Sequence, residues 1–487
     1  MYTIVSLMKK FFTLLAASLI SGAAFSQNAG YQITVHLPGY TSGIAYLAYY
    51  MGKNLNAADS GAVSNKGVVV FKGKEKLPGG IYSIVYPGKG ASADFLIDKD
   101  QNLTLNADSS NLTRVDVKGS KDNLSFMAYK RYVDLVGKEM MDERALYSSS
   151  KTKADSALHE AKFVKLNTRL NEFRDSIINA QPNSIMGVLL AAMKESPLPP
   201  KKAITHQDSI DNYHYYKAHY WDGITFMDDR IVRTPFFLPK LEKYYQEVII
   251  QQPDTIIADL DYKLLLARTA PEMYKFLLNW ATDEYISPKY MGLDAVFVHL
   301  FNKYHSKGLS PWLNDKQMET ITRRAYMQMA NLIGEKAADL NMVDSTNKPV
   351  SLYSVKAPYT VVIFWDPTCG HCKEELPHID SLYKASWKAK GVKVYAVLTE
   401  DQKPAWVKYI KEHKLGDWIN VYQTKEMADA VAKTEQPSFR QLYDVIMTPT
   451  MYLLDNDKRI IGKKLTWKQL NDLLEVKIAS KQNHTKK

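Results

Sequence analysis

Residues 364–377 read FWDPTCGHCKEELP and contain both cysteines of the 487-residue chain, Cys369 and Cys372. An apolar, β-branched run, Tyr359–Trp365, leads into this stretch, and a segment with helical character, from Cys372 to about Trp387, follows it. The pattern predicts a buried strand, a turn and a helix N-terminus that carries two thiols. We therefore expect a dithiol that cycles between reduced and disulfide forms.

Reactivity explains this cysteine pair better than structural stapling does. A CxxC disulfide closes a very small loop, so it would stabilise the fold little through chain entropy. The helix N-terminus favours negative charge at Cys369, and His371 can donate a hydrogen bond or carry charge near that sulfur. Cys372 lies one helical turn further in and should be the more buried, resolving thiol. We expect a Cys369–Cys372 disulfide in the oxidised form.

A proline near the C-terminus completes the expected site. Thr448-Pro449-Thr450 precedes an apolar strand, where proline cannot donate to a β-ladder. A cis Thr448–Pro449 bond beside the CxxC would leave the Thr448 backbone free to pair with a substrate chain. A trans proline at a strand start is the alternative, and the upstream CxxC and βαβ pattern favour the cis form.

Strands and helices alternate through residues 334–487, which indicates an α/β domain. The expected strands are 359–365, 392–398, 418–422, 450–454 and 459–464, and the expected helices are 372–387, 404–413, 438–444 and 467–478.

This region resembles the thioredoxin-like superfamily and, within it, the TlpA/ResA-like exported thiol–disulfide oxidoreductases. The resemblance rests on Gly334, Ala337-Ala338-Asp339-Leu340, Val350-Ser351-Leu352, Phe364-Trp365, Cys369-x-x-Cys372, Glu375, Pro377, Thr448-Pro449-Thr450 and Leu454-Asp455-Asn456-Asp457. It implies that Cys369 is the nucleophile, Cys372 the resolving thiol, Pro449 cis, and Glu375 a carboxylate that influences proton transfer. It also implies protein thiols and disulfides as partners, without cofactor or metal, and substrate contacts at Trp365, Thr368, Thr448 and Pro449.

Three departures from the family pattern qualify these expectations. Thr368 stands where the family usually has Trp before the first cysteine, so substrate contact there should differ. The strand Tyr359–Trp365 has no acidic residue to match the buried carboxylate of thioredoxin, which leaves Glu375 as the proton-handling candidate. The Gly-His dipeptide between the cysteines is similar to that of disulfide isomerases, so the direction of electron flow stays open.

The first half of the chain predicts two further domains. Short strands between Pro/Gly turns over residues 27–120 indicate an antiparallel all-β sandwich or barrel. They resemble an uncharacterised β-rich domain of exported thioredoxin-like proteins through Asp59–Val63, Val70–Gly73, Pro78, Tyr82, Val117–Ser120 and Asn123. Residues 121–333 have helical periodicity. An aromatic cluster at 213–221 is either core or a ligand groove, and the former is the commoner use of such side chains.

The N-terminus predicts export. Residues 1–26 contain Lys9-Lys10, an apolar run of about ten residues and then small residues, as in a secretory signal peptide. We expect cleavage after Ser26, a periplasmic protein without a transmembrane helix in its mature part, and a membrane electron donor or acceptor. The net charge of +11 is dispersed, so nucleic-acid binding is not indicated.

Alternative functions stay open at this point. In one, residues 27–333 recruit a partner as a scaffold, and redox chemistry is secondary. The hypothesis of peroxide reduction is weaker than that of thiol–disulfide exchange, because the proline spacing and the arginine partner of peroxidatic sites are not recognisable in the sequence. A zinc site would need ligands beyond the two thiols. The physiological substrate and the oligomeric state are not indicated by the sequence.

Overall fold

The structure, a computed structural model, describes residues 30–88 and 90–484. The predicted signal peptide therefore lies outside the described residues. The described chain forms two compact units, one of residues 30–248 with Leu266–Tyr274, the other of Ile249–Leu265 with the residues from Lys275 onward. Within the described residues, no helix combines the length and the apolar character needed to cross a membrane.

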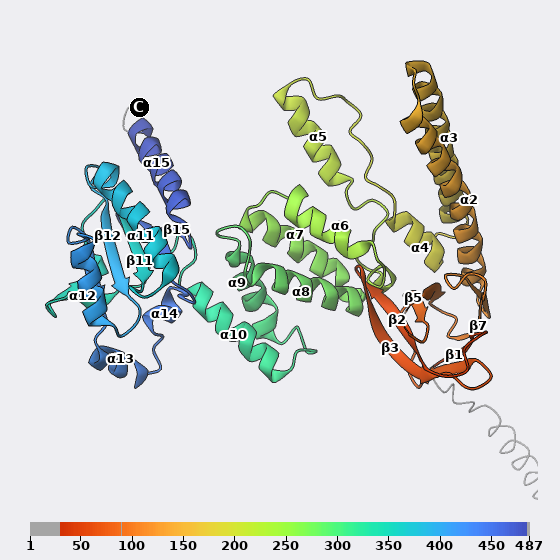
Figure 1. The fold of residues 1–487 in the computed structure, drawn as a ribbon, viewed down its shortest axis with the longest axis horizontal. Helices are drawn as coiled ribbons and strands as arrows, with labels where there is room; N and C mark the ends of the chain where they lie inside the picture. The colour runs from red at the N-terminus through yellow and green to blue at the C-terminus, as the bar shows by residue number, and fades with distance from the viewer. Residues whose placement is uncertain (1–29, 89, 485–487) are drawn as a thin grey trace, which may run out of the picture. The chain divides into compact units, whose positions relative to one another are not determined.

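The first unit begins with two four-stranded sheets, which confirms the sandwich-like prediction (Figure 1). Their strand orders are β4-β1-β7-β8 and β3-β2-β5-β6. The strands are β1 Tyr31–His36, β2 Ile44–Met51, β3 Asn54–Ala62, β4 Val68–Gly73, β5 Gly80–Val85, β6 Ser92–Ile97, β7 Asn102–Ala107 and β8 Val115–Lys118. The expectation of purely antiparallel pairing was wrong at one place, because β1 pairs with β7 in parallel. Alternate side chains such as Ile33, Val35 and Phe71 fill the core between the sheets.

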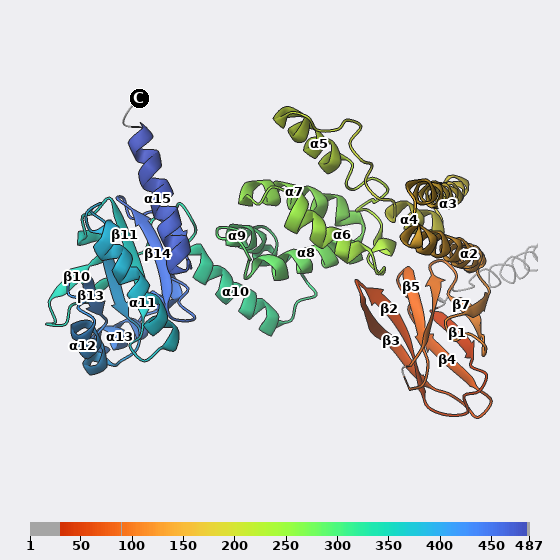
Figure 2. The same cartoon turned by 45° about the horizontal axis from the view of Figure 1, so that its top comes forward.

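Helices follow the sheets, as the periodicity predicted. They are α2 Lys121–Ser149, α3 Lys153–Ala180, α4 Ile185–Ala192, α5 His206–Ala218, α6 Phe237–Lys243, α7 Pro253–Leu266, α8 Pro271–Tyr285, α9 Asp294–Lys303 and α10 Asp315–Met329. Helices α2 and α3 lie side by side in both views (Figures 1 and 2). In the aromatic cluster at 213–221, Tyr220 is buried and its ring contacts Trp221 and Tyr244, so this part of the cluster is core.

The second unit contains a seven-stranded mixed sheet of order β10-β9-β13-β12-β11-β14-β15. Its strands are β9 Asn341–Val343, β10 Pro349–Ser351, β11 Tyr359–Trp365, β12 Lys393–Leu398, β13 Ile419–Tyr422, β14 Thr450–Asp455 and β15 Ile460–Lys463. Besides the preceding helices of this unit, which include α9 and α10, the sheet is accompanied by α11 Gly370–Leu382, continued by a π-helical turn Tyr383–Trp387, then α12 Lys403–Glu412, α13 Lys425–Ala432, α14 Phe439–Leu442 and α15 Trp467–His484. The sequence prediction missed the short strands β9 and β10 and helix α13.

Strand β11 organises this unit. All seven of its residues are buried, and it pairs in parallel with β12 and antiparallel with β14. Val361, Ile363 and Trp365 join the core on the face covered by α11, α12 and α15, whereas Val362 and Phe364 join the core on the other face. Because the strand runs into the FWDPTC turn, its carboxyl end fixes where the two cysteines lie.

Candidate active site

Cys369 lies at the N-cap position of α11, at the carboxyl end of β11. The backbone N–H of Cys369 donates to Asp366 O at 3.3 Å, and the Cys369 carbonyl accepts from Lys373 N at 3.2 Å. These two hydrogen bonds fix Cys369 between the preceding loop turn and the first turn of α11. The predicted placement of the first thiol at a helix N-terminus is confirmed.

Asp366 supports this turn from inside the protein, and sequence reasoning missed it. Its carboxylate Oδ1 accepts from the backbone N–H of Thr368 at 2.6 Å and from the Thr368 hydroxyl at 2.5 Å. The side chain is buried, and within residues 30–88 and 90–484 its Oδ2 atom has no hydrogen-bond partner. Strand β11 itself, Tyr359–Trp365, has no acidic residue, whereas the buried carboxylate of Asp366 comes one residue later, in the loop.

The surroundings of Cys369 favour its thiolate. Partial burial alone would raise the pKa of this thiol, but hydrogen bonds from the Thr448 side chain, from the N–H and thiol of Cys372 and from the N–H of His371 outweigh it and lower the pKa. In the protonated form, the Cys369 thiol donates to Thr448 O at 3.3 Å. Cys369 therefore combines partial exposure with donors aimed at its sulfur, as an attacking thiolate requires.

Cys372 is in the opposite situation. It is 1 % exposed and packs with Trp365 and Leu376 in the core. Burial raises the pKa of the Cys372 thiol to about 12, even though the Asp366 N–H favours its thiolate. The site therefore holds one partly exposed thiol with a lowered pKa and one buried thiol with a raised pKa.

The Thr448–Pro449 peptide bond is cis, as predicted. It lies between α14 and β14, and the Thr450 hydroxyl donates to Met447 O at 2.6 Å across the bend. The two residues before Thr448 are apolar and exposed, Ile446 by 64 % and Met447 by 73 %. The loop thus brings the Thr448 carbonyl to Cys369 and presents apolar side chains beside it.

The C-terminal region is similar in sequence to known proteins. The sequence profile of the AhpC/TSA family matches residues 333–463. A thiol-disulfide oxidoreductase ResA from Bacillus thuringiensis is 27% identical over 143 residues, which are 29% of this chain and 75% of that protein. The C-terminal region is that of a ResA/TlpA-like thiol–disulfide oxidoreductase. The chain is accordingly an oxidoreductase with a thioredoxin-like domain.

A second sequence profile and two solved structures are also similar to parts of this chain. A profile described as a domain of unknown function (DUF4369) matches residues 31–126, the β-rich region. A domain of a possible thiol-disulfide isomerase from Cytophaga hutchinsonii is 36% identical, covering 31% of this chain and 97% of that one at a TM-score of 0.28. A thioredoxin-like protein from Bacteroides caccae is 20% identical, covering 58% of this chain and 99% of that one at a TM-score of 0.45.

The structure places His371 and Glu375 away from direct contact with the thiols. The His371 imidazole is 84% exposed and lies 3.8 Å from the Glu374 carboxylate, so this residue acts on Cys369 through its backbone N–H. The Glu375 carboxylate accepts from Trp467 N at 3.2 Å, at the first residue of α15. Among the described residues, no hydrogen bond joins Glu375 to either cysteine.

Trp365 and Thr368 differ in their access to a substrate. Trp365 is fully buried and its ring packs against Tyr409 at 5.2 Å between centroids, so the oxidoreductase uses it as core. Thr368 is exposed beside Cys369 while its hydroxyl is held by Asp366. Across the described ranges, no group of three or more His, Cys, Asp or Glu side chains is arranged to hold a metal ion.

Proposed function

We propose that the protein exchanges disulfides with other proteins through Cys369 and Cys372. The observation that carries this proposal is the asymmetry of the pair, because Cys369 has a lowered pKa and partial exposure while Cys372 is buried with its pKa raised to about 12. Attack by one thiol and resolution by the other needs this difference.

The proposed reaction has two steps. The Cys369 thiolate attacks one sulfur of a substrate disulfide, forms an intermolecular S–S bond and releases the other substrate sulfur, which takes a proton from solvent. Cys372 then loses its proton and attacks the Cys369 sulfur. The intermolecular bond breaks, the second substrate thiol leaves, and a Cys369–Cys372 disulfide remains. Two electrons pass to the substrate, and an external dithiol must return them.

The cis-proline loop is the proposed contact for the substrate chain. The Thr448 carbonyl lies 3.3 Å from the Cys369 sulfur, so a chain bound along this backbone would bring its own sulfur to Cys369. Pro449 has no N–H, which leaves the loop backbone without an internal donor at that position. Thr368, which is exposed, directly precedes Cys369 in the turn between β11 and α11.

An insulin-reduction assay with dithiothreitol as electron source tests the proposal. We expect Cys369→Ser to abolish catalysis. Cys372→Ser, incubated with insulin after the dithiothreitol has been removed, should accumulate a mixed disulfide that is visible on a non-reducing gel. Reduction by Cys369→Ser at the parental rate would refute the mechanism. The reduction potential of the Cys369–Cys372 couple, measured in glutathione buffers, then gives the direction of electron flow. A difference of 30 mV from a partner couple corresponds to about 1.4 kcal/mol.

The proposed location is the periplasm, with a membrane protein as electron donor or acceptor. This part rests on the predicted signal peptide in residues 1–26 and on the family resemblance. Fractionation of cells that express the full chain tests it, because processing after Ser26 should yield a shorter protein in the periplasmic fraction. A full-length protein that stays in the cytoplasm would contradict it.

A further inference from the structure

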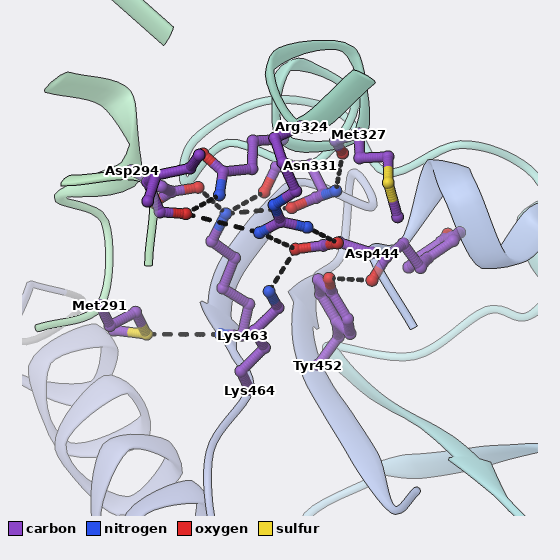
Figure 3. Close-up of polar contacts among 12 residues, drawn as sticks. Met291, Asp294, Arg324, Met327, Asn331, Asp444, Tyr452, Lys463 and Lys464 are labelled. Atoms are coloured by element: carbon purple, nitrogen blue, oxygen red, sulfur yellow. Dashed lines mark hydrogen bonds and ion pairs between the residues drawn. The ribbon is translucent and has the colours of Figure 1, made fainter. Parts of the chain in front are cut away.

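A buried ion pair joins helix α10 to the segment that follows α14 (Figure 3). Arg324 of α10 donates from Nη1 to Asp444 Oδ1 at 2.6 Å and from Nη2 to Asp444 Oδ2 at 3.3 Å. Lys464 also donates to the Asp444 carboxylate, and the Asp444 side chain is 0% exposed. A two-pronged guanidinium–carboxylate contact fixes orientation as well as distance.

A second buried pair secures the neighbouring strand to the same helical region. The Lys463 ammonium of β15 donates to Asp294 of α9, and both side chains are only 6% exposed. It also donates to Asn331 O at 2.9 Å and to Asn331 Oδ1 at 3.0 Å. Asn331 follows α10, so both ion pairs attach the sheet to α9 and α10 within one compact unit.

Three consecutive residues before the cis-proline loop are each held individually. Leu442 O accepts from Asn331 Nδ2 at 3.0 Å, Tyr443 O accepts from the Tyr452 hydroxyl at 2.5 Å, and Asp444 is held by Arg324. Asp444 has a φ of +46°, a backbone conformation that a non-glycine residue adopts infrequently. The surrounding contacts therefore determine how the chain leaves α14.

The held segment leads directly to the redox site. Only Val445, Ile446 and Met447 separate Asp444 from Thr448, and Val445 is itself buried in the core. Thr448 is the residue whose carbonyl accepts from the Cys369 thiol. A shift of Asp444 would thus be passed along three residues, one of them anchored, to the backbone that faces Cys369.

We propose that Arg324 is a positioning residue, which holds the cis-proline loop so that Thr448 can pair with a substrate chain. Helix α10 would then be a working part of the redox site, although the sequence pattern separates it from the thioredoxin-like region. This proposal rests on the proposed function, since it concerns the binding of a protein disulfide at Thr448. A small disulfide needs the Cys369 sulfur but no binding backbone, so its reaction should depend on Arg324 much less than the reaction of a protein disulfide does.

Amide hydrogen exchange on the full chain tests the positioning without any activity. Tyr443 N and Val445 N donate to Phe439 O at 3.0 Å and to Arg440 O at 2.8 Å. In Arg324→Met we expect amides 443–446 to exchange about tenfold faster or more, because their local opening becomes easier. Arg323→Met is the matched control, since Arg323 is exposed on the same helix and no ion pair of the described chain involves it. Equal exchange in both variants overturns the proposal.

Two disulfide substrates then separate positioning from general damage. We expect Arg324→Met to slow the reduction of insulin about tenfold or more relative to Arg323→Met, because small displacements of a binding backbone have large rate effects. Reaction with the small disulfide 5,5′-dithiobis(2-nitrobenzoate) should change by no more than about threefold, since the donors from Cys372 and the His371 N–H stay beside the Cys369 sulfur even where a weaker Thr448 hydrogen bond raises its pKa. Arg324→Lys, which keeps the charge but not the two-pronged contact, should fall between them.

Two further outcomes would contradict either the positioning role of Arg324 or the proposed disulfide-exchange function. Equal loss with insulin and with the small disulfide would overturn the positioning role. A parent protein that does not reduce insulin refutes the proposed function, while the exchange result still judges the loop. Should Arg324→Met not fold, Asp444→Asn removes the same ion pair while asparagine accepts the positive φ. The same exchange and two-substrate criteria then apply to that variant.

Discussion

Separating the two thiols by single substitutions gives the sharpest test of the active-site assignment. In Cys372→Ser only the Cys369 thiol remains, and in Cys369→Ser only the Cys372 thiol remains. Burial is the largest cause of the raised Cys372 pKa, and it persists in Cys369→Ser. Each variant can therefore report on one thiol in close to its native surroundings.

The expected ratio of their rates follows from the pKa of Cys372. Its rise from 9.0 to about 12 lowers the thiolate fraction near neutral pH about a thousandfold relative to an ordinary thiol. A more basic thiolate is also the better nucleophile, which returns about 15- to 30-fold for a Brønsted coefficient of 0.4–0.5. The net deficit is about 30- to 60-fold, before the 1 % exposure of Cys372 and the lowered pKa of Cys369 widen it.

Stopped-flow reaction with 5,5′-dithiobis(2-nitrobenzoate) between pH 5 and pH 10 measures both rates. We expect Cys369 to react at least about 30-fold faster at pH 7. Its rate should reach half of its plateau below pH 9, because the pKa of Cys369 is lowered, whereas the Cys372 rate should still rise at pH 10, because the pKa of Cys372 is about 12. Rates within about threefold of each other, or a faster Cys372, would refute the assignment of roles.

Three further predictions address residues with distinct physical roles. His371→Ala should leave the pKa of Cys369 nearly unchanged, because the imidazole is exposed and only the backbone N–H acts on the sulfur. His371→Pro removes that N–H and should raise the pKa of Cys369. Thiolate absorbance measured against pH distinguishes the two variants. Lys463→Met should lower the free energy of unfolding by about 3–5 kcal/mol, since it leaves Asp294 buried without its cation. Guanidinium denaturation measures this loss, and recovery by adding Asp294→Leu would show that the unpaired charge causes it. Burial lowers the pKa of His305 to about 4 from 6.5, so protonation favours the unfolded chain and stability should fall as pH drops from 6.5 towards 4. At pH 4.5 the loss should be about 2–3 kcal/mol greater than in His305→Gln by urea denaturation, and equal losses would contradict it.

The sequence by itself determined the position of the two cysteines at the end of a buried strand and the α/β fold around them. A continuous apolar strand followed by CxxC has few physical solutions, and β11, the start of α11 and the cis Thr448–Pro449 bond all lie where local pattern placed them. These features are encoded within short stretches, by β-branched residues, a helix N-terminus and one proline. The short strands β9 and β10 and helix α13 escaped prediction because brief elements have little periodicity and depend on their neighbours.

Tertiary structure alone decided which side chains serve the site. Glu375 and His371 are close to the cysteines in sequence, yet one carboxylate meets the Trp467 N–H and the imidazole faces solvent. Asp366 acquires its importance from burial, which no local pattern reveals. The pairing of Arg324 with Asp444 spans 120 positions, so it exists only once α10 packs on the sheet. Charge burial and long-range ion pairs arise only when distant segments pack together. The local sequence pattern therefore predicts where the two cysteines lie, whereas packing determines which other side chains contact them.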